Sequence, residues 1–178
     1  YEKSQFNPVP ISIDDKDAWI SHVAKRRNLY ERHLGIPLEL LRGRSVLEFG
    51  CNSGENSLVL ASFGSNLTLV EPNSLVAPRL RELFRHFDLE GSLTALVRED
   101  IDSFESEQLY DLVIAEGFLN TLGSRDDMLK KICGLVAPGG SAVISFDDRV
   151  GHFLELTRRV ILIRACRLEG IDDIQGDG

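Results

Sequence analysis

A glycine-containing loop follows an apolar run near residue 50, and its residue types suit ligand binding. Residues 46–55 read VLEFGCNSGE, and a helical pattern begins at the end of this stretch. Glycine at positions 50 and 54 lets the backbone turn sharply and lets a ligand approach the main chain, while the start of a helix offers free N–H groups. We therefore expect a nucleotide-type pocket at the carboxyl end of a buried strand. A tight turn that holds no ligand is the alternative.

Two features of this loop disfavour a dinucleotide. The spacing Gly50-x-Asn52-x-Gly54 lacks the third glycine of the pyrophosphate-binding fingerprint. Glu48 stands two residues before Gly50, where a carboxylate repels a diphosphate and attracts an ammonium or a sulfonium. The loop therefore favours a cationic ligand that combines an amino acid with a nucleoside and carries no phosphate.

Acidic residues follow the next two apolar runs. Glu71 comes after the second run, about twenty residues beyond the loop, where a carboxylate can accept both ribose hydroxyls. Asp100 comes after the third run, where it could accept from the exocyclic amine of adenine while the Ile101 N–H faces the ring. The alternatives are a solvated acid at Glu71 and a helix cap formed by Asp100 or Asp102.

The elements that must position these residues alternate along the chain. Short runs rich in Val, Leu and Ile alternate with amphipathic segments, which is typical of βαβ units and a parallel sheet. The predicted strands are 45–49, 67–70, 93–97, 112–115 and 142–146. The predicted helices are 14–33, 55–63, 75–88, a weak turn near 103–107, 125–136 and 151–168. We expect an α/β fold with a doubly wound, mostly parallel sheet and helices on both faces.

The ends of the chain divide it into three parts. We expect an extended arm and a helix over 1–40, capped by Asp14 or Asp15 and ended by Gly35 and Pro37, then a binding core over 41–150. Residues 151–178 should form a C-terminal helix and a frayed tail. That helix is apolar nearly all round, which favours packing on the sheet; a dimer face or a lid is the alternative. Because the chain starts with Tyr1 and Met128 is its sole methionine, we expect a piece of something longer.

Composition narrows the classes of function. The 178 residues include 20 Lys and Arg against 28 Asp and Glu, and the net charge of −8 disfavours a nonspecific nucleic-acid binder. The three cysteines are scattered and show no CxxC spacing, so we expect a reduced, cytoplasmic setting and no metal site. With no basic-then-apolar leader and no run of 18 apolar residues, neither export nor a membrane span is expected.

Taken together, residues 14–146 resemble the class I S-adenosylmethionine-dependent methyltransferases. The matching motifs are the loop 48–54, the ribose acid Glu71, the adenine-side acid Asp100, the fourth-strand motif 110–116 and the turn 135–140 into the fifth strand. The resemblance implies a Rossmann-like fold, S-adenosylmethionine as cofactor and S-adenosylhomocysteine as product. It also implies that the N-terminal helix forms a lid over the cofactor.

The resemblance also implies where the cofactor lies. The implied cofactor-binding residues are Glu48, Gly50, Cys51, Asn52, Gly54, Glu71, Pro72, Asn73, Asp100, Ile101 and Glu116. The methionine would lie against residues 50–54, with its ammonium near Glu48 and the carbonyl of Glu116. The ribose would sit on Glu71, and the adenine between Asn73 and the residues after the third strand.

The sequence departs from the family pattern in two places. Asn52 stands where the family often has glycine, which could tilt the loop without abolishing binding. The sixth and seventh strands that are usual in the family are not visible after the last helix. Asp111, within the fourth-strand motif, is expected to be structural and to close the start of that strand.

Methyl transfer depends mainly on alignment, so an obvious general base is not required. His152, just after the predicted fifth strand, is the candidate base for a hydroxyl acceptor, and a solvent-facing residue at a helix start is the alternative. His22 and His33 on the lid helix are further candidates, Tyr30 could reach the cofactor as well, and Asn120 is a further candidate on the acceptor side. Surface or packing roles are the alternative for the residues of the lid helix.

Two clusters of basic residues matter for the kind of methyl acceptor that we expect. The run 25–27 (Lys-Arg-Arg) near the lid could attract an anionic acceptor, whereas Arg79, Arg81 and Arg85 are expected to form a solvated helix face. We expect O- or N-methylation of a small molecule, with no nucleic acid and no membrane as partner, and with a homodimer left open. A non-catalytic cofactor-binding or scaffold subunit and an NAD-dependent oxidoreductase are the competing hypotheses.

Overall fold

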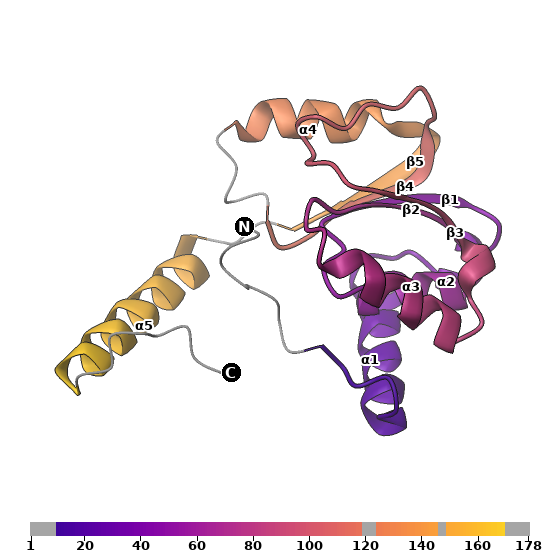
Figure 1. Cartoon of the computed structure of the whole chain (residues 1–178). Coiled ribbons are helices and arrows are strands. Elements are labelled where there is room, and N and C mark those ends of the chain that lie inside the picture. Colours follow the sequence, from indigo (N-terminus) through magenta and orange to yellow (C-terminus); the bar gives the residue numbers. More distant parts are fainter. Residues whose placement is uncertain (1–9, 119–123, 146–148, 170–178) are drawn as a thin grey trace. The chain divides into compact units, whose positions relative to one another are not determined.

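The computed structural model describes residues 10–118, 124–145 and 149–169. The chain divides into two compact units, Tyr1–Ile144 and Ser145–Gly178, and each is described by itself. The first unit contains the sheet, and the second contains the last helix. Figure 1 shows the elements of both units.

The first unit is built on one parallel sheet of five strands. The strands are β1 (Ser45–Phe49), β2 (Asn66–Val70), β3 (Leu93–Val97), β4 (Tyr110–Ala115) and β5 (Val136–Ile144). Their order across the sheet is β3-β2-β1-β4-β5, so the winding reverses between β1 and β4. Ligands of such folds bind at the carboxyl ends of the strands beside this reversal. The predicted fold class is confirmed, and the loop after β1 lies at the expected place.

Helices cover both faces of this sheet (Figure 1). One face carries α1, α2 and α3, and the other carries α4. The helices are α1 (Lys16–Asn28), a π-helical turn η1 (Leu29–His33), α2 (Glu55–Ser62), α3 (Val76–His86) and α4 (Arg125–Gly134). Two short 3-10 turns, η2 (Leu38–Leu41) and η3 (Glu90–Ser92), were not predicted. Asp15 caps α1, because its side chain accepts a hydrogen bond of 2.9 Å from the Ala18 N–H.

Alternation along β1 decides which side chains reach the site. Leu47 and Phe49 belong to the apolar cluster on the α4 side, whereas Val46 belongs to the cluster under α1, α2 and α3. Because successive side chains of a strand point to opposite faces, Glu48 points to the same side as Val46. A carboxylate near the end of β1 is therefore placed beneath α1 and α2.

Two predicted elements differ from the structure. The fifth strand begins at Val136 rather than at residue 142, because the segment predicted as a turn pairs with β4 across a register shift between Tyr110 and Leu112. The predicted helical turn near 103–107 is wrong. Ser103 and Ser106 bond main-chain carbonyls there, which competes with a helix, and the buried Phe104 packs edge-on against Phe49 at 5.5 Å between ring centroids. Position 146, the predicted end of the fifth strand, lies outside the described residues.

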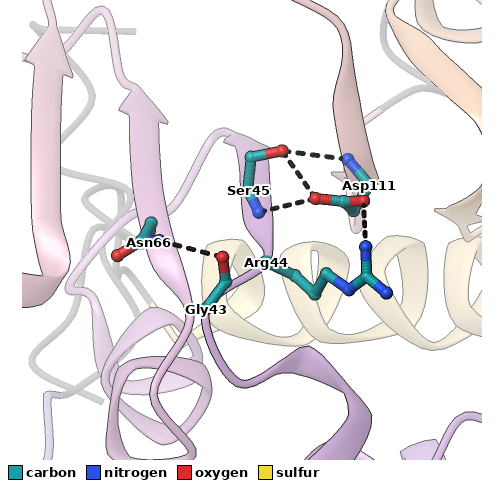
Figure 2. A network of polar contacts seen from close by, with 5 residues as sticks. All are labelled: Gly43, Arg44, Ser45, Asn66 and Asp111. Atoms are coloured by element: carbon teal, nitrogen blue, oxygen red, sulfur yellow. Dashed lines mark hydrogen bonds and ion pairs between the residues drawn. The ribbon is translucent and has the colours of Figure 1, made fainter.

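Asp111 fastens the starting ends of β1 and β4, as Figure 2 shows. Its carboxylate accepts from the Ser45 N–H and the Ser45 hydroxyl, each at 2.9 Å, and from Arg44 at 3.2 Å. The hydrogen bond from the Ser45 main chain, with further help from its hydroxyl and from Arg44, lowers the pKa of Asp111 below its ordinary value. This structural role is the one predicted for Asp111, at the end of the sheet away from the glycine loop.

The second unit contains α5 (Arg149–Leu168), close to the predicted helix. Apolar side chains that include Phe153, Ile161 and Leu168 are exposed along it. Whether this helix packs on the sheet concerns both units together and stays a prediction. Within the described ranges, no helix is long and apolar enough to cross a membrane.

Candidate functional site

The loop between β1 and α2 owes its shape to three residues with positive φ. Gly50, Asn52 and Gly54 have φ values of 66°, 50° and 88°. Gly54 caps α2 directly, and a Cβ there would lie 2.1 Å from a methyl carbon of Leu80 on α3. Asn52, at the position where glycine is usual, takes the left-handed conformation that asparagine tolerates better than most residues. The tilt expected at Asn52 therefore takes the form of a left-handed backbone conformation, which is strained but accessible to asparagine.

Glu71 joins this loop to the end of β2. The carboxylate is 4% exposed and accepts from the Asn52 N–H at 3.0 Å with one oxygen and from the Asn73 N–H at 2.9 Å with the other. Since each carboxylate oxygen offers about two lone pairs, both keep capacity for a ligand hydroxyl. Asn73 in turn accepts from the Leu75 N–H at 3.0 Å, just before α3. The predicted ribose acid is thus held in place by two main-chain donors.

Glu48 is buried at the same edge of the sheet. It is 4% exposed, and the hydroxyl of Ser57 donates a hydrogen bond of 2.6 Å to its carboxylate. Burial raises the pKa of Glu48 to about 7, while the Ser57 hydrogen bond and the charge of Arg26 oppose the rise. Burial likewise raises the pKa of the neighbouring Cys51 thiol, which lies in the loop. Glu48 is therefore a carboxyl group poised between its two charge states near neutral pH.

Arg26 ties α1, the helix expected to form a lid, to the end of β4. Its guanidinium lies 2.7 Å from the carboxylate of Glu116 and 3.4 Å from the hydroxyl of Tyr30, and it stacks over the Tyr30 ring at 5.2 Å from the centroid. The Arg26 and Glu116 side chains are 12% and 20% exposed. Tyr30 is fully buried, and burial raises its pKa above the usual value. Sequence reasoning assigned Glu116 only through its carbonyl and missed this ion pair.

The basic run does not form the predicted anion-attracting surface. Arg26 is neutralised by Glu116, and Arg27 forms ion pairs with Glu31 at 2.9 Å and with Glu39. Lys25 is exposed. The expectation of an attractive patch therefore fails for both arginines, because each guanidinium already has a carboxylate partner.

A second buried ion pair fixes the N-terminal arm. Glu55, at the start of α2, accepts from Arg79 at 2.9 Å, from the Ile11 N–H at 3.2 Å and from the Ser53 hydroxyl. Arg79 also donates to the Ile11 carbonyl at 3.0 Å. The prediction of a solvated face is wrong for Arg79, which bridges α3, α2 and the arm.

The remaining predicted cofactor residues lie along the same edge of the sheet. Pro72 is half-buried beside Glu71. Asp100 and Ile101 follow β3, the neighbour of β2; Asp100 is exposed, and Ile101 packs with its side chain in the cluster on the α4 side. The main-chain carbonyl of Asp100 accepts from the Phe104 N–H at 3.0 Å.

The structure describes the side chains of some candidate acceptor-side residues and not of others. The side chain of His152 and all of Asn120 lie outside the described residues. His33 is exposed and contacts Asn28 at 3.3 Å. His22 is half-buried on α1; burial, followed by the charge of Arg26, lowers its pKa, and its Nε2 has no hydrogen-bond partner within the described part of the chain.

A methyltransferase-domain family matches residues 22–171 of the chain. The chain belongs to this family. No curated protein matches the methyltransferase domain in sequence. The matched segment begins within α1 and ends just beyond α5, so it includes the loop, both buried carboxylates and the second half of α1.

Solved structures share the fold of this methyltransferase domain. Coclaurine N-methyltransferase, bound to N-methylheliamine and S-adenosylhomocysteine, has a TM-score of 0.58 and 23% identity over 70% of this chain and 35% of that one. The N-methyltransferase NodS from Bradyrhizobium japonicum, in complex with S-adenosylhomocysteine, has a TM-score of 0.56 and 20% identity over 80% of this chain and 69% of that one. The glycopeptide N-methyltransferase MtfA, complexed with S-adenosylmethionine, has a TM-score of 0.55 and 19% identity over 69% of this chain and 53% of that one. The chain thus spans between about a third and two thirds of these structures.

Proposed function

We propose that this methyltransferase domain binds S-adenosylmethionine at the carboxyl ends of β1, β2 and β4 and transfers its methyl group to a small-molecule acceptor. The observation that carries the proposal is the pair of buried carboxylates, Glu48 and Glu71, on either side of a glycine loop. Family membership supports it, as do the solved relatives of the same fold that hold this cofactor or its product.

The charge of the site suits S-adenosylmethionine. Glu116 and Glu71 act electrostatically on Glu48, as does the guanidinium of Arg26, which pairs with Glu116. An excess of carboxylate repels a diphosphate and favours a ligand with an ammonium and a sulfonium. This argues against an NAD-dependent oxidoreductase, as does the absence of a third glycine in the loop.

Each part of the ligand has residues suited to it. The loop 50–54 would hold the methionine, with its ammonium between Glu48 and the main chain of Glu116. Glu71 would accept the ribose hydroxyls, since its two oxygens are already oriented by main-chain donors. Asn73 with Pro72 on one side and residues 100–101 on the other would enclose the adenine.

The bound cofactor supplies a methyl group that is already activated by the sulfonium. The protein holds the reactants in line, and such alignment accounts for roughly 7–11 kcal/mol in well-oriented reactions. The lid helix α1 would exclude water from the methionine end, fastened there by Arg26 and Glu116. Removal of a proton would assist a hydroxyl acceptor, whereas a neutral amine already carries the lone pair that attacks the methyl group.

The proposal is tested by measuring S-adenosylhomocysteine formation with a panel of small amines and phenols. Turnover that depends on an acceptor would establish methyl transfer to a small molecule. Cofactor binding without turnover on any acceptor would instead support the non-catalytic subunit, and turnover on RNA or protein alone would refute the small-molecule acceptor. A sedimentation measurement in the same buffer would decide whether the domain forms a homodimer.

A further inference from the structure

Ser57 lies under the candidate site and donates to the carboxyl group that faces it. Ser57 is the third residue of α2 and is fully buried, with 0% of its surface exposed. Its Oγ lies 2.6 Å from Oε2 of Glu48, itself 4% exposed. Because the turn at Gly54 starts α2 directly beside the end of β1, a residue in the first turn of the helix reaches the strand. This contact joins two elements of the site through side chains alone.

The other groups around Glu48 do not replace this donor. Arg26 and Tyr30 face it from the lid, Glu116 from the end of β4, Glu71 from the end of β2 and Cys51 from the loop. The Arg26 guanidinium pairs with Glu116 at 2.7 Å and attracts a charge on Glu48 without a hydrogen bond to it among those described, whereas Glu116 and Glu71 repel that charge. The charged form of Glu48 is therefore opposed by burial and by two neighbouring carboxylates, and it is favoured by the Ser57 hydrogen bond and by the charge of Arg26.

We infer that Ser57 is a positioning residue of the proposed cofactor site, whose hydroxyl favours the charged form of the Glu48 carboxylate and orients it toward the ammonium of the methionine. This inference rests on the proposed function, because it presupposes a cationic amino-acid group at Glu48. Ser57 would act through the Glu48 carboxylate, to which its hydroxyl donates.

The inference predicts the direction in which the pKa of Glu48 changes when the Ser57 hydroxyl is removed. A hydrogen bond to the carboxylate lowers its pKa, so removing the hydroxyl raises the pKa of Glu48 above the value of about 7 that it has with Ser57 in place. Below that pKa the group is neutral and no longer attracts an ammonium. One charge-assisted hydrogen bond corresponds to a shift on the order of one pH unit, and each unit changes the affinity at a fixed lower pH about tenfold.

The test is a calorimetric titration of the whole chain with S-adenosylhomocysteine between pH 5.5 and 8.5. For the unmodified chain the affinity should fall below a midpoint near pH 7. Ser57→Ala should move this midpoint upward by about one pH unit, with about tenfold weaker binding at pH 5.5, about fivefold weaker binding at pH 7 and little difference at pH 8.5. Ser65→Ala is the matched control, since Ser65 is also fully buried and its hydroxyl has no partner among the described residues.

A Glu48→Gln variant guards against a merely structural effect. In that background the pH midpoint should disappear, and adding Ser57→Ala should change nothing further. Equal weakening by Ser57→Ala at every pH, or a midpoint unchanged from that of Ser65→Ala, would overturn the inference while leaving the proposed function intact. If the unmodified chain does not bind S-adenosylhomocysteine at any pH, the proposed function itself fails.

Discussion

Gly54 offers a perturbation whose cost follows from the structure. Its φ is +88°, and the ideal Cβ of an alanine would lie 2.1 Å from Leu80 Cδ2 and 3.4 Å from Leu83 Cδ2. Two carbon atoms pack best about 3.5–4.0 Å apart, so the Leu80 methyl must move. Both leucines are fully buried in the cluster under α1, α2 and α3, so the displaced methyl group must move within that cluster.

The magnitude combines two effects. A left-handed backbone costs an L-residue about 1–2 kcal/mol, and overpacking a filled core costs about 1–3 kcal/mol. Gly54→Ala should therefore lower the free energy of unfolding by about 2–5 kcal/mol. Gly35→Ala is the matched control, because Gly35 also has a positive φ, of 68°, but its Cβ would meet nothing within 4 Å. That control should lose only the backbone contribution of about 1–2 kcal/mol.

Urea denaturation followed by circular dichroism measures both variants, and unchanged slopes show that the compactness of the states is comparable. The difference between the two variants isolates the contact with Leu80. If Gly54→Ala and Gly35→Ala lose the same stability, the close packing of the loop on α3 is refuted.

Two further predictions concern the lid and the base of the sheet. Arg26→Ala should release α1 and speed amide hydrogen exchange over residues 16–28 about tenfold, because Glu116 and the Tyr30 ring lose their partner. Arg27→Ala breaks exposed ion pairs and should speed this exchange less. Equal exchange rates in the two variants would contradict the role of Arg26. Asp111→Asn should destabilise the domain near neutral pH, as measured by urea denaturation. Since the folded-state pKa of Asp111 is lowered, its contribution to stability is complete above the unfolded-state pKa of about 3.9 and is lost as the pH falls through the folded-state pKa. The difference in stability between the variant and the unmodified chain should therefore close below about pH 4. A difference that persists there would contradict the network of Figure 2.

The strands near the site could be predicted from the sequence because both faces of the sheet are covered. β1 and β3 begin and end where the apolar runs 45–49 and 93–97 predict. β5 could not be placed as well, because the glycines at 139 and 140 are typical of a turn, and their pairing with β4 depends on a register shift between strands. The helical turn near 103–107 failed because serine side chains bond the local main chain.

Some residues of the candidate site could likewise be predicted from the sequence, and others could not. Glu48, the loop glycines and Glu71 could be predicted, because each follows a buried run at an offset that chemistry requires. The pairs Arg26–Glu116 and Glu55–Arg79 join residues that are 90 and 24 positions apart, and hydrophobic periodicity carries no signal for them. Ser57 resembles any polar residue in a first helical turn until the path of β1 brings Glu48 beside it.

The central claim is that the buried carboxylates beside the glycine loop hold a sulfonium nucleoside. The most direct measurement is a calorimetric titration of the domain with S-adenosylmethionine and S-adenosylhomocysteine, with NAD as the control ligand. We predict micromolar binding of the two sulfur nucleosides and none of NAD. Binding should be lost in Glu71→Ala, which removes the acceptor of the Asn52 and Asn73 N–H groups, and kept in Glu82→Ala on the exposed face of α3. Binding of NAD alone, or equal affinity in Glu71→Ala and the unmodified domain, would contradict the account.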